Sequence, residues 1–311
     1  MNINKKLKSG FWITVITMAI LLTIVLGRLV WAHYQVSKYE IISESFVVTE
    51  LGSVESLNIL PLFEEWTSSN ELQSGHGVSY LIKTDQSNIL MDLGNNEQNL
   101  DTAPLLHNMK QLGIEMDEID KVVISHNHPD HVGGVTNWKR GNISVGRHHD
   151  NLDGKKVYLP VKLTSPSIEI ELALEPMVIA PGVATLGRQP FVQPFPFWLW
   201  EPLGWELSLV VNVEEKGLVI ITGCGHPTME RIIERAEAIF PQSVIGVVGG
   251  MHYENADEEA LKQHINFLEL RNPELVALSP HDSSGGVLQV FEAAFPKVYR
   301  YITVGRAIEI P

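Results

Sequence analysis

The sequence predicts a mixed α/β domain in which two mixed β-sheets lie between layers of helices, preceded by one membrane-spanning helix. An uncharged apolar stretch near the N-terminus indicates the membrane-spanning helix. The first half of the remainder contains hairpin-like pairs of apolar runs, such as LIKTDQSNILMDLG. The last third alternates strand-like and helix-like runs, the pattern of a mixed sheet with helices outside. Two sheets fit this order better than a single doubly wound sheet.

The apolar stretch FWITVITMAILLTIVLG, residues 11–27, contains no charge, and its apolar character resumes after Arg28 with LVWA. A bilayer requires a span of about 20 apolar residues. Three lysines precede the stretch, and basic residues on that side predict a cytoplasmic N-terminus. We therefore predict a single-pass membrane protein whose remaining residues lie outside the cytoplasm. Its expected parts are a cytoplasmic basic tail (1–10), a transmembrane signal-anchor (11–32), a linker (33–45) and one folded domain (46–311).

Two other interpretations of the apolar stretch are open. A cleaved signal peptide normally has an apolar region of about 7–15 residues and small residues at the cut. This stretch is longer, and Val30-Trp31-Ala32 is a poor cleavage site. A buried core helix is opposed by the flanking lysines. The uncleaved anchor is therefore the interpretation that fits best.

Composition and charge narrow the class of protein. With 311 residues, 44% hydrophobic and 19% charged, the chain is typical of a globular protein. Residues 1–40 carry a net charge of +4, and because the whole chain carries −14, the remainder carries −18. Such an acidic surface argues against binding nucleic acid, whose phosphates need basic patches. Cys224 is the only cysteine, so no intrachain disulfide forms. We expect a small-molecule substrate; the sequence does not fix an oligomeric state.

Apolar runs bounded by turn residues place the elements of the domain in order. The strand candidates are residues 46–51, 78–83, 88–92, 121–125, 156–159, 168–172, 207–213, 217–222, 244–248 and 275–279. The helix candidates are residues 99–112, 228–240, 256–270 and 285–295. The sequence has no internal repeat and no low-complexity tract, so one domain accounts for all of these elements.

One run, KVVISHNHPDHVGGVT, concentrates histidine and aspartate where a predicted strand ends. Pro129 biases His128 toward extended backbone, and alternate residues of an extended segment share one side. His126, His128 and Asp130 would then face together. His131 would face the other way, so that side chains of one loop reach two neighbouring positions. Imidazole and carboxylate together suit zinc, manganese or iron. A solvated polar loop is the alternative interpretation.

Three further histidines each follow an apolar strand candidate and precede a helix candidate. GLVIITGCGHPT contains His226, SVIGVVGGMHY contains His252 and ELVALSPHDSSGG contains His281. Strand ends on one edge of a sheet converge in space. We expect His226 and His281 to be ligands, because a metal needs more ligands than the first cluster supplies. His252 has three open interpretations: a metal ligand, a substrate-positioning residue, or a cap of the following helix.

Other polar residues in similar settings have two interpretations each. Cys224 is either a thiolate ligand or a small apolar residue at a tight turn, and we favour the second. Asp92 follows a strand candidate, where it would orient a ligand histidine through the second ring nitrogen. His76, in SGHGVSYLI, would contact substrate. For Asp92 and His76, ordinary turn chemistry is the alternative.

These motifs resemble the metallo-β-lactamase superfamily. HNHPDH is similar to its HxHxDH signature, and further matches resemble its dihydropterin-synthase-like branch. They are HGVS (76–79), LMDLG (90–94), TGCGH (222–226), GGMH (249–252) and PH (280–281). The resemblance extends over nearly the whole predicted domain and implies a four-layer αββα sandwich. It also implies two divalent metal ions, zinc first, with manganese or iron as alternatives.

Departures from the family pattern bear on the ligand set. The stretch WEPLGWELSL lacks the histidine that most members have there. CGH stands where many members have a bridging aspartate, and HDSSG where the branch often has HCTG. The resemblance implies a first metal on His126, His128 and His226. It implies a second metal on Asp130, His131 and His281.

The function implied is hydrolysis by a metal-bound hydroxide. We take Asp130 and His252 as the candidate catalytic residues, with Asp130 also ligating a metal and orienting or deprotonating the water. Esters, lactones and phosphodiesters are compatible substrates. A proline- and aromatic-rich stretch, residues 188–205, suits an apolar wall beside the site or a lip touching the membrane, with loop packing as the alternative. Two other functions are a non-catalytic membrane-tethered metal-binding protein and an iron-using oxidoreductase on the same fold.

Overall fold

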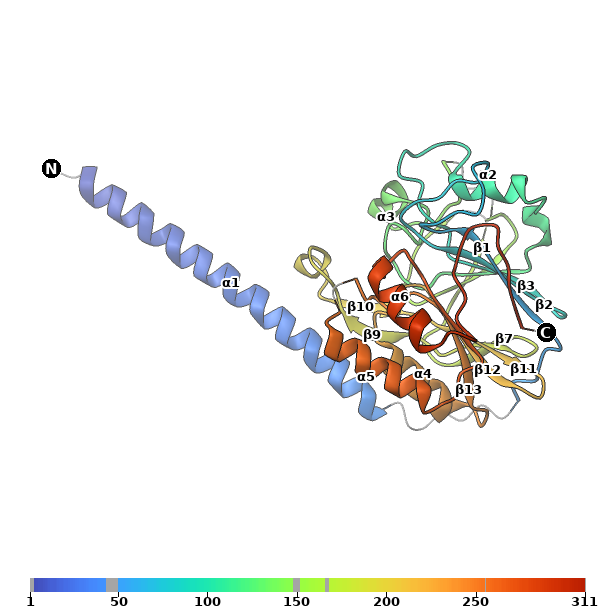
Figure 1. The fold of residues 1–311 in the computed structure, drawn as a ribbon. Coiled ribbons are helices and arrows are strands. Elements are labelled where there is room, and N and C mark those ends of the chain that lie inside the picture. Colours follow the sequence, from blue (N-terminus) through green and yellow to red (C-terminus); the bar gives the residue numbers. More distant parts are fainter. Residues whose placement is uncertain (1–2, 43–49, 148–151, 166–167, 255, 311) are drawn as a thin grey trace. The chain divides into compact units, whose positions relative to one another are not determined.

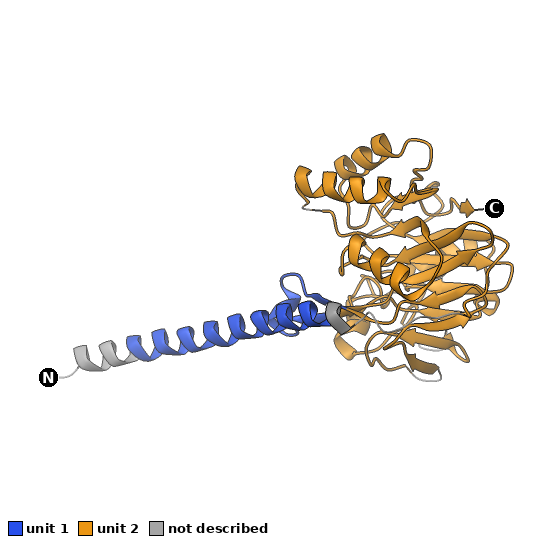
Figure 2. Ribbon diagram, turned by 90° about the horizontal axis from the view of Figure 1, so that it is seen from below, with its two compact units in different colours: residues 1–43, 190–204 blue, residues 44–189, 205–311 orange. Residues whose placement is uncertain are grey.

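The structure of the chain, a computed structural model, describes residues 3–42, 50–147, 152–165, 168–254 and 256–310 (Figure 1). It divides into two compact units (Figure 2). The smaller unit contains residues 1–43 and 190–204, and the larger unit contains residues 44–189 and 205–311. All residues predicted to form the metal site belong to the larger unit.

A single long helix, α1 (Ile3–Ile42), makes up most of the smaller unit. Its segment Phe11–Tyr39 is long and apolar enough to cross a membrane, and the most apolar window of that segment is not buried. A helix satisfies its own backbone hydrogen bonds, which is the condition for crossing hydrocarbon. The helix also includes residues 33–42 of the predicted linker, whereas residues 43–45 lie outside the described part. The apolar helix is confirmed, and the membrane crossing stays a prediction.

The first sheet of the larger unit is mixed, with seven strands in the order β15-β1-β2-β3-β4-β5-β6. The strands are β1 (Leu57–Phe63), β2 (Ser79–Thr84), β3 (Asn88–Met91), β4 (Lys121–Val123), β5 (Lys156–Leu159), β6 (Glu169–Leu172) and β15 (Ile308–Ile310). Neighbours are antiparallel from β15 to β3 and parallel from β3 to β6.

The second sheet is also mixed, with six strands in the order β14-β13-β12-β11-β8-β7. The strands are β7 (Met177–Ala180), β8 (Val183–Thr185), β11 (Leu209–Val213), β12 (Gly217–Thr222), β13 (Val244–Gly249) and β14 (Leu275–Leu278). β12, β13 and β14 run parallel, and the other pairs are antiparallel. A separate ribbon pairs β9 (Gln189–Val192) with β10 (Leu203–Glu206).

In the described part of the larger unit, five α-helices lie between strands along the chain: α2 (Pro104–Gln111), α3 (Val135–Arg140), α4 (Met229–Ile239), α5 (Glu258–Glu269) and α6 (Gly285–Ala294). Alternate strand residues face opposite ways. Ile82 therefore packs in the core between the two sheets, and Leu81 packs with Met109 of α2. Ile221 likewise packs between the sheets, and Ile220 packs with residues of α4, α5 and α6. The predicted order of helices, sheet, sheet and helices is confirmed.

Two expectations about strands differ from the structure. Residues 46–49 of the first strand candidate lie outside the described residues, and Glu50 and Leu51 are not in a strand. β1 was not among the strand candidates, and neither were β7, β8, β9, β10 and β15; Pro61 in the LNILPLF sequence of β1 is unfavourable in the interior of a sheet. A register shift between Pro61 and Phe63 accommodates the proline while β1 pairs with strands on both sides.

Candidate metal centre

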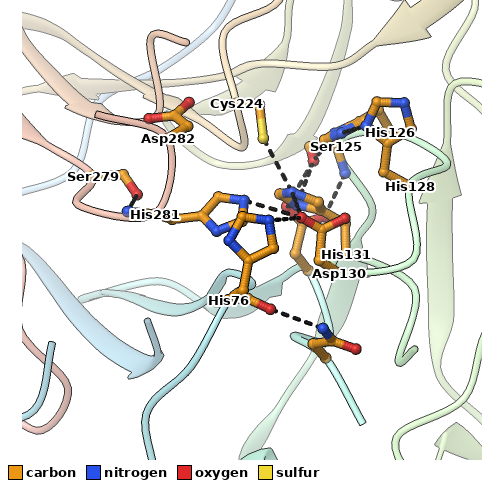
Figure 3. Close-up of polar contacts among 12 residues, drawn as sticks. His76, Ser125, His126, His128, Asp130, His131, Cys224, Ser279, His281 and Asp282 are labelled. Atoms are coloured by element: carbon orange, nitrogen blue, oxygen red, sulfur yellow. Dashed lines mark hydrogen bonds and ion pairs between the residues drawn. The ribbon is translucent and has the colours of Figure 1, made fainter. Parts of the chain in front are cut away.

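The histidine-rich loop begins where β4 ends, so its side chains start at the edge of the first sheet. His126 is 1% exposed and His128 is 6% exposed. Nε2 of His126 lies 2.9 Å from Nδ1 of His128. The expectation that Asp130 shares their side is wrong, because residues 129–133 form turns rather than extended backbone. The turns direct the aspartate to a second group of side chains (Figure 3).

The first set of candidate ligands is His126, His128 and His226. Their ligand atoms lie within 4.8 Å of one another. His226 reaches the loop from the second sheet, because it follows β12 directly. Burial and neighbouring imidazoles hold the pKa of both His126 and His226 well below the usual range. Neutral imidazole is the form of histidine that binds metals.

The second set is Asp130, His131 and His281, whose ligand atoms also lie within 4.8 Å of one another. Oδ2 of Asp130 is 3.0 Å from Nε2 of His281 and 3.7 Å from Nε2 of His131. His281 follows β14, so this set also joins the two sheets. The ring centroids of His126 and His131 are 4.1 Å apart, which places the two sets side by side.

Cys224 lies where the two sets meet. Its Sγ is 3.2 Å from Nε2 of His131, and the thiol forms a third possible ligand set with His126 and His131. Since His126 belongs to the first set and His131 to the second, the sulfur is within reach of both. The side chain is buried, and burial raises the pKa of the thiol. The small-residue interpretation of Cys224 leaves this contact with His131 unexplained.

The charge of the second set favours a bound cation. Burial opposes protonation of His131, but the carboxylates of Asp92 and Asp130 outweigh it and raise its pKa to about 9. Burial opposes ionisation of Asp130, but His131 and His281 hold its pKa below the usual range. The site therefore attracts positive charge, which a divalent metal would supply in place of the proton. Imidazole, carboxylate and thiol donors are the ligand types that zinc prefers, so these residues fit a metal.

Asp92 contacts His131, which favours the histidine-orienting interpretation of Asp92 over ordinary turn chemistry. Its Oδ2 lies 2.7 Å from Nδ1 of His131, and its Oδ1 accepts the backbone N–H of Ser125 at 2.6 Å. The Ser125 hydroxyl donates to the same carboxylate. A carboxylate on one ring nitrogen fixes the ring and leaves the other nitrogen to face a metal. Asp92 thereby connects the ends of β3 and β4.

Gly223 is required by the close approach of the two sheets at this carboxylate. A Cβ atom there would lie 2.2 Å from the Ser125 hydroxyl oxygen and 3.0 Å from Oδ2 of Asp92. Contacts this short force the neighbouring atoms to move. Gly223 therefore lets the TGCGH loop pack directly on the pair that orients His131.

Replacing Gly223 by alanine is expected to weaken metal binding by about 10- to 100-fold, the usual effect of disturbing an outer-shell partner. The added methyl group would displace Ser125 and Asp92, and His131 would lose its orientation. Competition with a chromogenic chelator measures the affinity. Gly285→Ala is the matched control, since a Cβ there meets nothing within 4 Å. Equal affinities for the two variants would contradict this role.

Glu206 holds the TGCGH loop in place and was missed by the sequence analysis. Its side chain is fully buried and accepts the backbone N–H groups of Cys224, Gly225 and His226 at 3.0, 2.8 and 2.8 Å. Burial raises the pKa of this carboxyl to about 7. It lies in the stretch where most family members carry a histidine. The available signal was an acidic residue between apolar residues in GWELSL.

Two further buried acids support the loop that carries His281. Glu64 accepts the hydroxyls of Tyr80 and Ser279, and the Ser279 hydroxyl in turn accepts the backbone N–H of His281. Asp282 accepts the backbone N–H of His252 at 2.9 Å. Burial raises the pKa of both carboxyls. Neither acid was among the site residues predicted from the sequence.

His252 and His76 lie at the exposed side of the centre. His252 does not cap α5, whose N-cap is Asp257; its ring centroid is 4.6 Å from that of His226. Nε2 of His76 is 3.7 Å from Oδ2 of Asp130, and its ring centroid is 4.1 Å from that of His281. A cavity of about 290 Å³ opens beside His76. His76 lines this cavity, and the exposed His252 lies beside the first ligand set.

Comparisons with known proteins agree with this geometry. A family model described as the metallo-beta-lactamase superfamily matches residues 73–235, more than half of the chain. In Methanocaldococcus jannaschii, the protein named 7,8-dihydropterin-6-methyl-4-(beta-D-ribofuranosyl)-aminobenzene-5'-phosphate synthase is 27% identical over 260 residues. That match covers 72% of this chain and 86% of the relative.

Solved structures of the superfamily share the fold. Tm1679, described as a metal-dependent hydrolase of the beta-lactamase superfamily, superposes with a TM-score of 0.62 and 22% identity, covering 82% of this chain and 99% of that chain. YhfI of Bacillus subtilis, a metallo-beta-lactamase fold protein, has a TM-score of 0.53 and 11% identity, covering 82% and 100%. At these identities the likeness is one of fold alone.

Proposed function

Because the chain belongs to the metallo-beta-lactamase superfamily, we propose that it is a membrane-anchored, metal-dependent hydrolase. The observation that carries the proposal is the pair of adjacent ligand sets at the strand ends of both sheets. The first set is His126, His128 and His226; the second is Asp130, His131 and His281. Two divalent cations, zinc first by the donor types, would occupy them. The apolar helix α1 would anchor the chain, with the lysine-rich end in the cytoplasm.

The side chains around the two sets have distinct tasks in hydrolysis. When bound, divalent cations supply Lewis acidity and lower the pKa of water to about 7. Asp130 supplies the carboxylate of the second ligand set. Its side chain is 14% exposed, so incoming water can reach it. It can accept a proton or a hydrogen bond from the attacking water. His252, on the rim beside His226, can donate to the oxygen on which charge develops.

The substrate class follows from the chemistry of the donor sets and from the relative. Esters, lactones and phosphodiesters all present an oxygen to be polarised and a bond that hydroxide cleaves. The archaeal relative's name describes the synthesis of a phosphate compound. We therefore include phosphodiesters beside carboxylic esters.

The test of this function uses the full chain, purified in detergent and loaded with zinc. Nitrophenyl esters, a lactone series and bis(nitrophenyl) phosphate serve as substrates. We expect turnover of at least one class, lost on treatment with a chelator and restored by adding zinc. Full metal occupancy without turnover of any of these substrates would instead favour a membrane-tethered metal-binding protein.

Replacing Cys224 by serine is expected to remove a thiolate-to-metal charge-transfer band from the cobalt-substituted protein. The buried thiol lies within reach of both ligand sets, and a thiolate bound to cobalt absorbs in the near ultraviolet. Since Cys224 is the only cysteine, no other thiolate contributes. A native cobalt protein without this band would show that the thiol is not a ligand.

A further inference from the structure

The smaller unit contains a short uncharged segment rich in aromatic residues, PFPFWLW at residues 194–200. Its central turn is a 3-10 helix, Phe197–Leu199. The side chains of Phe195 and Trp200 are 73% and 66% exposed, and Leu199 is also exposed. Large apolar side chains clustered on a surface mark an interaction site rather than ordinary surface.

Arg28 of α1 binds this segment directly. Its guanidinium donates to the backbone carbonyl of Leu199 at 3.1 Å and also to that of Trp200. These two carbonyls lie at the C-terminal end of the 3-10 helix, where no following helical N–H group of the described chain donates to them. The contact fixes the aromatic segment to α1 at one position, the first charged residue after the apolar run of residues 11–27.

Arg28 lies near the outer end of the predicted membrane-spanning segment, residues 11–32. Seventeen residues of helix rise about 26 Å, close to the hydrocarbon thickness of about 30 Å. Trp and Tyr concentrate at the two membrane–water interfaces. Trp12 stands at one end of the run, and Trp31 and Tyr34 stand beyond the other end, all three exposed. Residues 194–200 are therefore held at the level of the second aromatic group.

Charge favours lipid as the partner of this segment. From Gln189 to Trp200 no residue is charged, whereas the chain after residue 40 carries a net −18. An acidic surface is repelled by anionic headgroups. An uncharged aromatic segment is the part of such a chain that can enter the interface without that repulsion.

We propose that residues 194–200 insert into the outer interface of the same bilayer that α1 crosses, as a second membrane contact. The proposal rests on the membrane anchor of the proposed function. Phe195 and Trp200 would lie among the lipid headgroups, and Arg28 would tie them to the helix. One helix alone leaves the chain free to rotate about the point where it leaves the bilayer, and a second contact removes part of that freedom.

The test places an environment-sensitive fluorophore on single introduced cysteines of the full chain, reconstituted in phosphatidylcholine bilayers. The native Cys224 is 4% exposed and does not compete for the label. Phe195→Cys and Trp200→Cys report the segment, and Ile20→Cys reports the helix. Leu270→Cys is the matched control, because Leu270 is an exposed leucine, 82% accessible, outside the segment. Nitroxide lipids labelled near the headgroup or deep in the acyl chain quench the fluorophore.

We expect quenching by the shallow nitroxide at positions 195 and 200 to exceed that at 270 several-fold, with deep quenching at position 20. Quenching at 195 and 200 no greater than at 270, with position 20 still quenched, would overturn this inference and leave the anchor intact. Absence of quenching at position 20 would overturn the anchor and this inference together.

Discussion

Replacing His128 by alanine is expected to remove one equivalent of metal per chain and to lower turnover by about 1,000-fold, since metal catalysis supplies several kcal/mol and each 1.36 kcal/mol is tenfold in rate. His128 contributes one of the three nitrogens of the first set. Nδ1 of His128 lies 2.9 Å from Nε2 of His126, and the His128 side chain is buried. Metal analysis and steady-state kinetics on the same preparation measure both effects.

His107→Ala is the matched control for this variant. His107 lies in α2, where its Nε2 is 2.9 Å from the backbone carbonyl oxygen of Glu71. It belongs to neither ligand set. Its replacement should leave metal content and turnover unchanged. Full activity of His128→Ala, or an equal loss in both variants, would remove the histidine loop from the mechanism.

Replacing Glu206 by alanine is expected to destabilise the fold by about 3 kcal/mol or more, because each buried donor left unpaired costs about 1–3 kcal/mol. Three backbone N–H groups, of Cys224, Gly225 and His226, lose their acceptor at once. For a domain of this size the melting temperature should fall by about 10 °C. Thermal unfolding followed by circular dichroism measures the melting temperature.

Two other variants separate this role from a general loss of charge. Glu214→Ala removes an exposed carboxylate just after β11 and should leave the melting temperature unchanged. Glu206→Gln keeps one oxygen acceptor and should lie between the native protein and the alanine variant. A Glu206→Ala protein as stable as Glu214→Ala would mean that the TGCGH loop does not depend on this carboxylate.

The histidines of the site could be predicted from the sequence because each follows an apolar run. His126, His226, His252 and His281 stand directly after strand candidates, and strand ends of one sheet converge. Which of these side chains lie together depends on the backbone conformation of the loops, which the spacing of residues in the sequence does not give. Asp130 joins His131 and His281 because a turn interrupts the extended backbone at Pro129.

The supporting acids could not be predicted for a different reason. Glu206 and Glu64 act on residues far along the chain, through backbone N–H groups and hydroxyls of other loops. An acid between apolar residues, as in GWELSL, can indicate burial, but the local pattern does not show which distant groups the carboxylate accepts. β1 contains Pro61, a residue that local strand patterns do not favour. The predicted end of the first helix at residue 32 was too early, because residues 33–42 were assigned to a linker and belong to α1.

The most direct test of the two-metal centre is the metal content of the full chain, purified in detergent without a chelator. Inductively coupled plasma mass spectrometry gives equivalents per chain. Two adjacent ligand sets predict about two equivalents of zinc, manganese or iron, falling to about one in His128→Ala. Fewer than one equivalent in the native protein, even after zinc is added back, would contradict the metal centre and with it the proposed hydrolase.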